Sequence, residues 1–167
     1  MTLAAMELGK PSPALTIQGS GRPAMKLTEF RGKVVLLAFI HTTCPHCQQL
    51  TTTTLVPVAR EYAPRGVQVV ECAFNQGAGE LVGAFAQQFQ TPFRVGWTDY
   101  STVMAYLGRS PNDQRPFFVP HLVFLDRQGN IQGDYAGESD FMKTPEPNIR
   151  KELDRLLKLP ATAAVRK

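Results

Sequence analysis

The chain has 167 residues, of which 43% are hydrophobic and 19% charged, a composition typical of ordinary globular proteins. The net charge is only +4 and the 18 basic residues are dispersed, which argues against a nucleic-acid-binding protein. No stretch is long and apolar enough for a transmembrane helix. We expect one domain over residues 8–160, between a frayed start (1–7) and a flexible tail (161–167).

The first predicted element is a β-hairpin within residues 8–33. Residues 15–17 alternate as in a strand, residues 19–23 are rich in turn formers, and the alternation resumes at residues 25–27. The hairpin leads into residues 34–40 (VVLLAFI), seven consecutive apolar residues. A run this short and this rich in β-branched residues is typical of a buried central strand.

Directly after this strand the chain turns at residues 41–43 and presents the sequence Cys-Pro-His-Cys at the start of a predicted helix. A helix N-terminus offers unpaired N–H groups and the positive end of the helix dipole, and both favour the thiolate form of a cysteine. Pro45 suits the first helical turn because its missing N–H would have no partner there. Two thiols at this spacing form a disulfide and release it again, so Cys44 and Cys47 are the predicted redox pair.

The remaining segments complete an α/β pattern. The predicted helices are residues 47–62, 80–90, 101–107 and 146–157, and the predicted strands are residues 67–74, 93–97, 121–126 and 131–135. A run of threonines together with Pro57 predicts a kink in the first helix near residues 53–56. Leu81, Phe85 and Phe89, with Val82 and Ala86 beside them, mark the buried face expected for the second helix. A helix between two apolar strands is a βαβ unit, so the first two long strands should be parallel.

The strand, the turn and the C-x-x-C motif closely resemble the thioredoxin superfamily. The similarity extends from about Leu8 to Leu157 and is carried by ELGKPSPALTI, LTEFRGKVVLLAF, CPHC, GVQVVECAFN, Val119-Pro120 and HLVFLDRQGNI. The flanking segments are similar to the exported TlpA and ResA group, described broadly as redoxin or AhpC/TSA-like. The Pro-His pair between the cysteines resembles the oxidising, DsbA-type members.

This resemblance implies a three-layer, thioredoxin-like α/β fold. A central mixed β-sheet would be flanked by helices, with the N-terminal hairpin and a helix-strand insertion at residues 80–97 added to it. The implied activity is that of a thiol-disulfide oxidoreductase that acts on protein substrates without a bound cofactor. The implied partners are protein thiols and disulfides and an unidentified redox protein, and we expect a monomer.

The resemblance also implies roles for individual residues. Cys44 would be the exposed nucleophile, and Cys47 would resolve the mixed disulfide. His46 is a candidate for stabilising the Cys44 thiolate, which would make the pair more oxidising; the alternative is an exposed histidine without a role. Pro120 resembles the cis-proline that faces the cysteines, so that Val119 would offer its backbone to a substrate strand. A trans proline in a loop is the alternative.

Three further side chains near this proline have two interpretations each. Phe117 and Phe118 would form an apolar rim for a partner or pack in the core. His121 would tune Cys44 or be a structural histidine, and His41 is interpreted as structural.

Two residues of the second strand need separate explanations. Cys72 is left without a partner if the other two cysteines pair, and it is best interpreted as a buried, unreactive thiol. Glu71 carries a carboxylate in an apolar strand, so it must reach an edge or find a partner. No further cysteines or histidines stand at the spacing of a zinc site, and we predict no metal.

The sequence departs from its family at two positions. Thioredoxins carry a buried acid where this chain has Ala38, and ResA-like reductases carry a glutamate where it has Leu50. Both acids move protons to or from the resolving cysteine, so their loss favours an oxidant or isomerase. A reductase of the ResA or TlpA type stays open as the alternative, with His46, His121, Glu71 or water in place of the acid.

Two other activities fit less well. A peroxidase of the AhpC/TSA type needs a proline and a threonine ahead of its cysteine, where this chain has Leu37 and His41. A copper-handling module would be compatible with soft thiolates but lacks a distal histidine motif. Family members work in the periplasm or cell envelope, whereas residues 1–10 show no apolar segment of a signal peptide, so a cytoplasmic location stays open.

Overall fold

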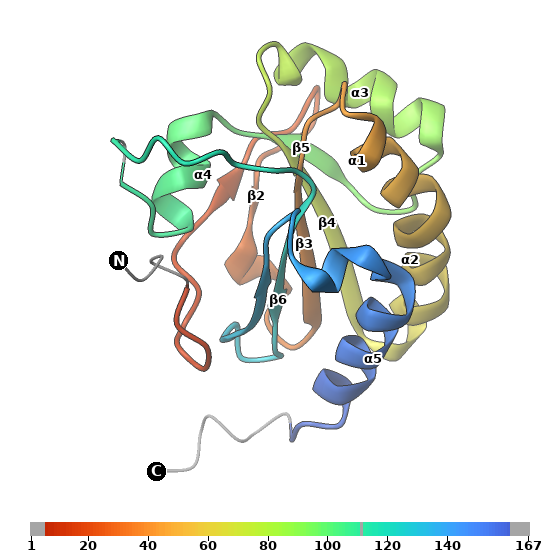
Figure 1. Cartoon of the computed structure of the whole chain (residues 1–167). Coiled ribbons are helices and arrows are strands. Elements are labelled where there is room, and N and C mark those ends of the chain that lie inside the picture. Colours follow the sequence, from red (N-terminus) through yellow and green to blue (C-terminus); the bar gives the residue numbers. More distant parts are fainter. Residues whose placement is uncertain (1–5, 111, 161–167) are drawn as a thin grey trace.

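A five-stranded mixed β-sheet forms the centre of the molecule in our computed structural model, which describes residues 6–110 and 112–160 (Figure 1). The strand order is β5-β4-β3-β6-β7, and β1 and β2 form a separate two-stranded antiparallel sheet. β3, β4 and β5 are parallel, whereas β6 and β7 run antiparallel. The strands are β1 Thr16–Ile17, β2 Met25–Lys26, β3 Val34–Ile40, β4 Val67–Ala73, β5 Val95–Trp97, β6 His121–Leu125 and β7 Ile131–Tyr135.

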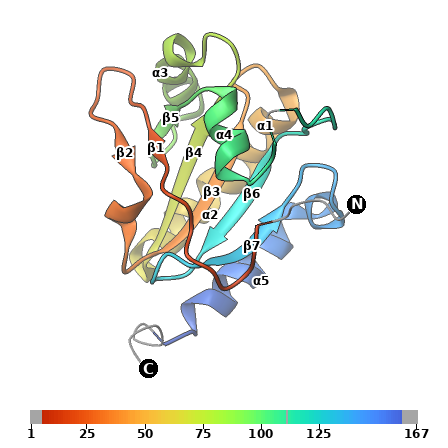
Figure 2. The same ribbon diagram turned by 90° about the vertical axis from the view of Figure 1, so that its left-hand side faces the viewer.

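Helices cover both faces of this sheet. The α-helices are α1 Pro45–Leu50, α2 Val56–Tyr62, α3 Ala78–Phe89, α4 Tyr100–Tyr106 and α5 Pro145–Leu157. Short 3-10 helices occur at Leu27–Phe30, Ala63–Arg65 and Asp140–Lys143, and a π-helix joins α1 to α2 at Thr51–Leu55. α1, α2, α3 and α5 pack on one face, while α4 and the β1–β2 hairpin pack on the other (Figures 1 and 2). The predicted three-layer α/β fold, with its N-terminal hairpin and helix-strand insertion, is confirmed.

β3 is the central strand, as predicted. All seven of its side chains are at most 2% exposed, because β4 and β6 pair with its two edges and helices cover its two faces. Alternate residues point to opposite faces: Leu36 and Ala38 join the cluster under α1 and α2, and Leu37 and Phe39 join the cluster under α4. β3 therefore ends with both layers fixed around it, directly before the two cysteines.

The first helix does not simply kink near residues 53–56; it widens into the π-helix. Pro57 has no N–H to donate and its ring crowds the carbonyl four residues earlier, which disfavours a regular α-helix. The threonine hydroxyls also bond backward to carbonyls four residues earlier: Thr51 to Cys47 (2.9 Å), Thr52 to Gln48 (3.0 Å) and Thr53 to Gln49 (2.7 Å). The sequence therefore located the irregularity but not its form.

One residue of the predicted face of α3 was predicted wrongly. Leu81 is 40% exposed, whereas Val82 and Phe85 are buried as expected and Phe89 packs against the same cluster. Leu81 stands at the edge of the buried stripe, which begins at Ala78 and continues through Val82 and Phe85 at helical spacing.

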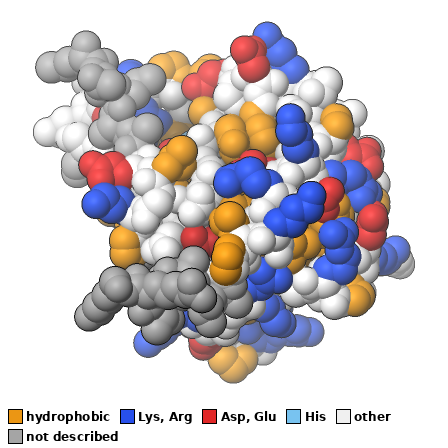
Figure 3. All heavy atoms as spheres, turned by 90° about the horizontal axis from the view of Figure 1, so that it is seen from below, with side chains coloured by type: hydrophobic (Ala, Val, Ile, Leu, Met, Phe, Trp, Pro, Cys, Tyr) orange, Lys and Arg blue, Asp and Glu red, His pale blue; other side chains and the backbone are white. Residues whose placement is uncertain are grey.

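The described part of the chain stops short of both ends. Residues 1–5 and 161–167, predicted as frayed and flexible ends, lie outside the described residues, whereas the amide of Met6 donates to Asp134. No helix within residues 6–110 and 112–160 is long and apolar enough to cross a membrane. Figure 3 shows basic side chains interspersed with acidic and apolar ones on the underside, as their dispersal in the sequence suggested.

The hairpin joins the main sheet where β5 carries Gly96. Gln18 and Trp97 exchange two backbone hydrogen bonds of 2.8 and 3.0 Å there. A Cβ atom at Gly96 would lie 2.4 Å from the side chain of Ile17 and 2.5 Å from the carbonyl oxygen of Gln18. Such distances are well inside van der Waals contact, so only glycine permits this approach.

We predict that Gly96→Ala lowers the free energy of unfolding by about 1–3 kcal/mol, because the hairpin must shift away from β5. Gly83→Ala is the matched control, since a Cβ there meets only Ser20 Oγ at 3.5 Å. Because Gly83 lies in the interior of α3, replacing it with alanine should raise the free energy of unfolding by up to ~1 kcal/mol. Urea unfolding of both variants measures the difference, and equal effects would contradict the proposed close approach.

Candidate active site

The turn between β3 and α1 is held by hydrogen bonds to the loop after β4. The N–H of Thr42 donates to Asn75 Oδ1, and Asn75 Nδ2 donates to Thr42 Oγ1, both at 2.9 Å. Gln48 Nε2 donates to the carbonyl of Thr42, also at 2.9 Å. This pairing fixes the direction in which the chain enters α1.

Cys44 and Cys47 occupy different environments at the start of α1. Cys44 is the N-cap residue and is half-buried, whereas Cys47 lies fully buried in the first turn. Both are free thiols. Burial raises the pKa of Cys47 strongly, Cys44 and Glu71 add to this effect, and a hydrogen bond from the backbone of His41 opposes it. Cys44 is thus the thiol that an external partner can reach.

A cavity of about 620 Å³ lies beside the cysteines. Its walls come from α1, the π-helix, the segment before β6 and residues 137–147. His46 lines it and is exposed, as is Pro45 at the first position of α1. Val119 and Pro120 form part of the opposite wall, and the bond between them is cis.

The two phenylalanines before this proline have different surroundings. Phe118 is 51% exposed and lines the cavity. Phe117 is half-buried, and its ring centroid lies 5.6 Å from that of Phe74 and 5.2 Å from that of His121, on which it stacks. Phe118 therefore has the position of a rim residue, and Phe117 belongs to the packing beneath it.

His121 points away from the cysteines. It pairs with Phe39 in the sheet and faces the α4 layer, whereas Cys47 lies in the cluster on the opposite face. Its Nε2 bonds to Asp134. The structure does not bring His121 to Cys44, so its contacts support the structural interpretation.

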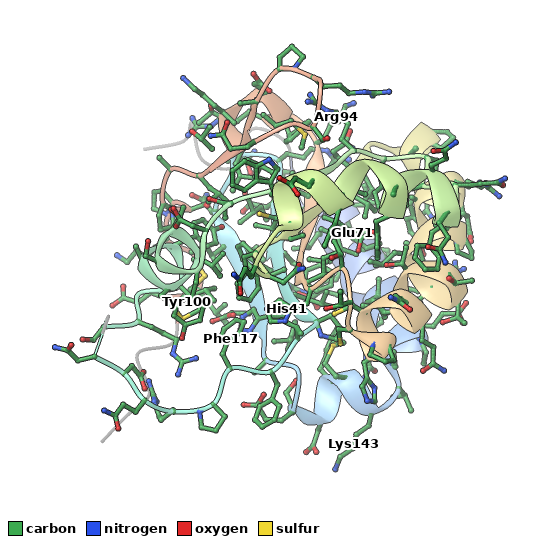
Figure 4. The ribbon with its side chains drawn as sticks, turned by 90° about the horizontal axis from the view of Figure 1, so that it is seen from above. His41, Glu71, Arg94, Tyr100, Phe117 and Lys143 are labelled. Carbon is green, nitrogen blue, oxygen red and sulfur yellow. The ribbon has the colours of Figure 1, made fainter. Side chains whose placement is uncertain are left out.

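His41 and Cys72 also lie outside the cavity. The ring of His41 packs 4.5 Å from that of Phe74, and burial lowers the pKa of His41. Figure 4 shows His41 on the side of Phe117 and Tyr100. Cys72 is fully buried in the cluster under α4, and burial raises the pKa of its thiol. Within the part of the chain described, no group of three or more His, Cys, Asp or Glu side chains could hold a metal.

The side chain of Glu71 is hydrogen-bonded to Thr51 on the face of the sheet that carries Cys47. It is fully buried and pairs in register with Ala38 on the neighbouring strand. Thr51 Oγ1 lies 2.9 Å from Oε2 of Glu71, and Oε1 has no hydrogen-bond partner among the described residues. Burial raises the pKa of Glu71 to about 8, although the bond from Thr51 opposes this shift. Figure 4 places Glu71 in the interior of the molecule.

Thr51 is the residue that the sequence did not single out. It lies four positions after Cys47, so the two residues share one side of a helix. The register of β3 with β4 then places the Glu71 carboxyl against the side of the helix that carries Cys47 and Thr51. The helical spacing was visible in the sequence, but the register was not.

Comparisons with known proteins agree with this geometry. The Redoxin family model matches residues 7–153. No curated protein sequence matches the chain. Among solved structures, a thiol:disulfide interchange protein of the thioredoxin family from Chlorobium tepidum is similar with a TM-score of 0.71 and 19% identity, covering 92% of this chain and 99% of its own.

Two further structures are similar to the same extent. The thioredoxin domain of a thiol-disulfide oxidoreductase from Bacteroides vulgatus has a TM-score of 0.71 and 15% identity, over 92% of this chain and 100% of that one. A thiol:disulfide interchange protein from Bacteroides sp. has a TM-score of 0.70 and 15% identity, over 94% and 93%. At these identities the likeness shows the fold.

The state of Glu71 predicts how stability depends on pH. The folded protein keeps this carboxyl protonated up to about pH 8, whereas in the unfolded chain it ionises near 4.5. The unfolded state therefore binds fewer protons between these values, and this group makes stability fall as the pH rises. We predict that Glu71→Gln removes this pH dependence. The free energy of unfolding of the variant should therefore rise relative to that of the wild type by at most ~5 kcal/mol between pH ~4.5 and ~8.

Urea unfolding of the reduced proteins at several pH values measures this difference. The control is Glu80→Gln, because Glu80 is an exposed acid at the start of α3 and should show no comparable gain. A difference between Glu71→Gln and wild type that is constant from pH 4.5 to 8 would show that Glu71 is ionised normally.

Proposed function

Because this chain belongs to the Redoxin family and is a thiol-disulfide oxidoreductase of the thioredoxin type, we propose that it exchanges disulfides with protein substrates through a mixed disulfide on Cys44. Cys47 then resolves that mixed disulfide. The observation that carries this proposal is the contrast between the two thiols, since Cys44 caps α1 at the surface and Cys47 is fully buried beside it. Only an accessible thiolate can attack a large partner, and only an adjacent thiol can then displace that partner.

The cavity supports a polypeptide as the substrate. Neither the N–H nor the C=O of Val119 is hydrogen-bonded to the described part of the chain. An extended substrate segment can pair with both groups while its cysteine reaches Cys44. Phe118 and His46 flank the same cavity and offer an apolar and a polar contact. The substrate is thus held mainly through its backbone, which suits an enzyme with many protein partners.

We propose that the physiological direction is oxidation of substrate thiols. His46 stands exposed within the first turn of α1, between the two cysteines, where its protonated form would stabilise a Cys44 thiolate. A more stable thiolate leaves a disulfide more readily, so the pair becomes a stronger oxidant. The second candidate is a reductase, which the buried carboxyl of Glu71 on the side of Cys47 favours, since such a group can take a proton from the resolving thiol.

We predict that Cys47→Ser traps the mixed disulfide. Incubated with insulin, whose disulfides serve as the probe, the variant should form a covalent adduct through Cys44 that dithiothreitol releases. The wild type should not accumulate the adduct, because Cys47 resolves it. Non-reducing gel electrophoresis and mass spectrometry of the linked peptides measure the outcome. Cys44→Ser is the control, and an equal yield of adduct from that variant would refute Cys44 as the nucleophile.

The direction is tested by the reduction potential of the Cys44–Cys47 pair, measured by equilibration in glutathione buffers and thiol trapping. We expect a value near the oxidising end of the superfamily, about −120 mV, and a more negative value for His46→Ala. Gln49→Ala is the matched control, because Gln49 is an exposed residue of α1 that lines the same cavity. A wild-type value near −270 mV would instead identify a reductase.

A further inference from the structure

Glu71 is a fully buried carboxyl group on the side of the sheet that carries the resolving cysteine. It reaches only one hydrogen-bond partner among the described residues, the hydroxyl of Thr51, and leaves Oε1 unpartnered. A buried carboxyl with an unused oxygen is costly, and a purely structural role would be served better by an apolar residue. The position therefore calls for a function.

The hydrogen-bond distances around Thr51 indicate the protonation state of this carboxyl. Thr51 Oγ1 lies 2.9 Å from the carbonyl oxygen of Cys47 and 2.9 Å from Oε2 of Glu71. A hydroxyl has one hydrogen to donate, so an ionised Glu71 would leave one of these contacts without a hydrogen. If Glu71 is protonated, its O–H donates to Thr51, Thr51 donates to Cys47, and both contacts are satisfied. The arrangement fits the neutral acid.

No other described group competes for this proton. The strands on either side of Glu71 present Ala38 from β3 and Val95 from β5. α3 contributes apolar side chains to the same cluster, among them Val82 and Phe85. The titratable group that faces Glu71 from α1 is Cys47, whose own pKa is raised in part by the charge of Glu71, and Cys44 lies beyond it. Cys47 is therefore the titratable group that interacts with Glu71, and Cys47 in turn interacts with Cys44.

We propose that Glu71 is the proton donor and acceptor for the Cys47 thiol, that the proton passes through one water molecule between the unpartnered Oε1 of Glu71 and Cys47 Sγ, and that the Thr51 hydroxyl reverses its hydrogen bond when the proton moves. This inference rests on the proposed function and adds a residue to it. When Glu71 loses its proton, Thr51 turns to donate to the carboxylate and releases the carbonyl of Cys47. The Thr51 hydroxyl lies between the carboxyl of Glu71 and the backbone carbonyl of Cys47, at the start of the π-helix.

In the oxidising direction, the reaction consists of two successive thiol-disulfide exchanges. A substrate thiolate attacks Cys44 Sγ, an S–S bond forms between them, and the Cys44–Cys47 bond breaks. Cys47 leaves with the electron pair as a thiolate, and Glu71 protonates it. A second substrate thiolate then attacks the substrate sulfur, so that the substrate becomes a disulfide and Cys44 leaves as a thiolate. The reduced protein then holds the Cys44 thiolate and the Cys47 thiol, and the Glu71 carboxylate takes a proton back from solvent. In the reverse direction the Glu71 carboxylate takes the proton from Cys47 before that sulfur attacks.

The test separates the two steps with an aromatic disulfide, 5,5′-dithiobis(2-nitrobenzoate), mixed with the reduced protein in a stopped-flow instrument. The first thionitrobenzoate released reports attack by Cys44, and the rate of this release depends on reagent concentration. The second thionitrobenzoate reports attack by Cys47, and the rate of its release is independent of reagent concentration. In Glu71→Gln we expect an unchanged first release and a second release at least ~10-fold slower at pH 7. The second release should keep rising with pH beyond the point at which the wild type levels off.

Threonine variants give an independent reading if Glu71→Gln does not fold. Thr51→Val should slow the second release, and Thr51→Ser, which keeps the hydroxyl, should restore most of the rate. Thr52→Val is the matched control, since Thr52 makes the same backward bond, to Gln48, but is exposed and does not contact Glu71. It should behave as the wild type.

The outcomes distinguish this inference from the proposed function. A second release in Glu71→Gln with the wild-type rate and pH profile would overturn the role of Glu71. Equal slowing of both releases at every pH, shared by Thr52→Val, would show a structural effect and overturn it as well. By contrast, a wild type that releases only one equivalent, or a second release that persists in Cys47→Ser, would refute the proposed function itself.

Discussion

The parallel pairing of β3 with β4 is the constraint on which the site depends. Because both strands end at the same edge of the sheet, the turn before α1 lies within reach of the loop after β4, and Thr42 and Asn75 bind each other there. The same pairing sets Ala38 opposite Glu71. One register therefore fixes both the direction in which the cysteines are presented and the carboxyl group that lies behind them.

The sequence was informative where local chemistry decides the structure. Local sequence patterns predicted the central strand β3, the turn into α1 and the proline at the first position of α1. The structure has all three. His121 shows the limit, because one residue along a strand decides which face a side chain occupies. Its closeness to Pro120 in sequence left both a place beside the cysteines and a structural role open, and the pleat turns it to the opposite face, against Asp134.

The relation of Glu71 to Thr51 could not be predicted for a similar reason. It requires the strand register and the start of the helix at the same time. Each of these is a tertiary property, although the threonine run and Pro57 did mark where the helix departs from regularity. The missing family acids at Ala38 and Leu50 left a question in the sequence, and a neighbouring strand supplies a carboxyl at the same depth.

The contrast between Phe117 and Phe118 bears on how this protein can diversify. Arg109 lies over the ring of Phe117 and also pairs with Asp113, so the segment before Pro120 is anchored to the α4 side from beneath. Phe118 stands outside that anchor and contributes to the rim. If Phe118 contacts substrates as we propose, substitutions at this exposed position would change which partners are accepted without disturbing the thiols. Selection, natural or in the laboratory, can therefore act on recognition and on redox chemistry as separate traits.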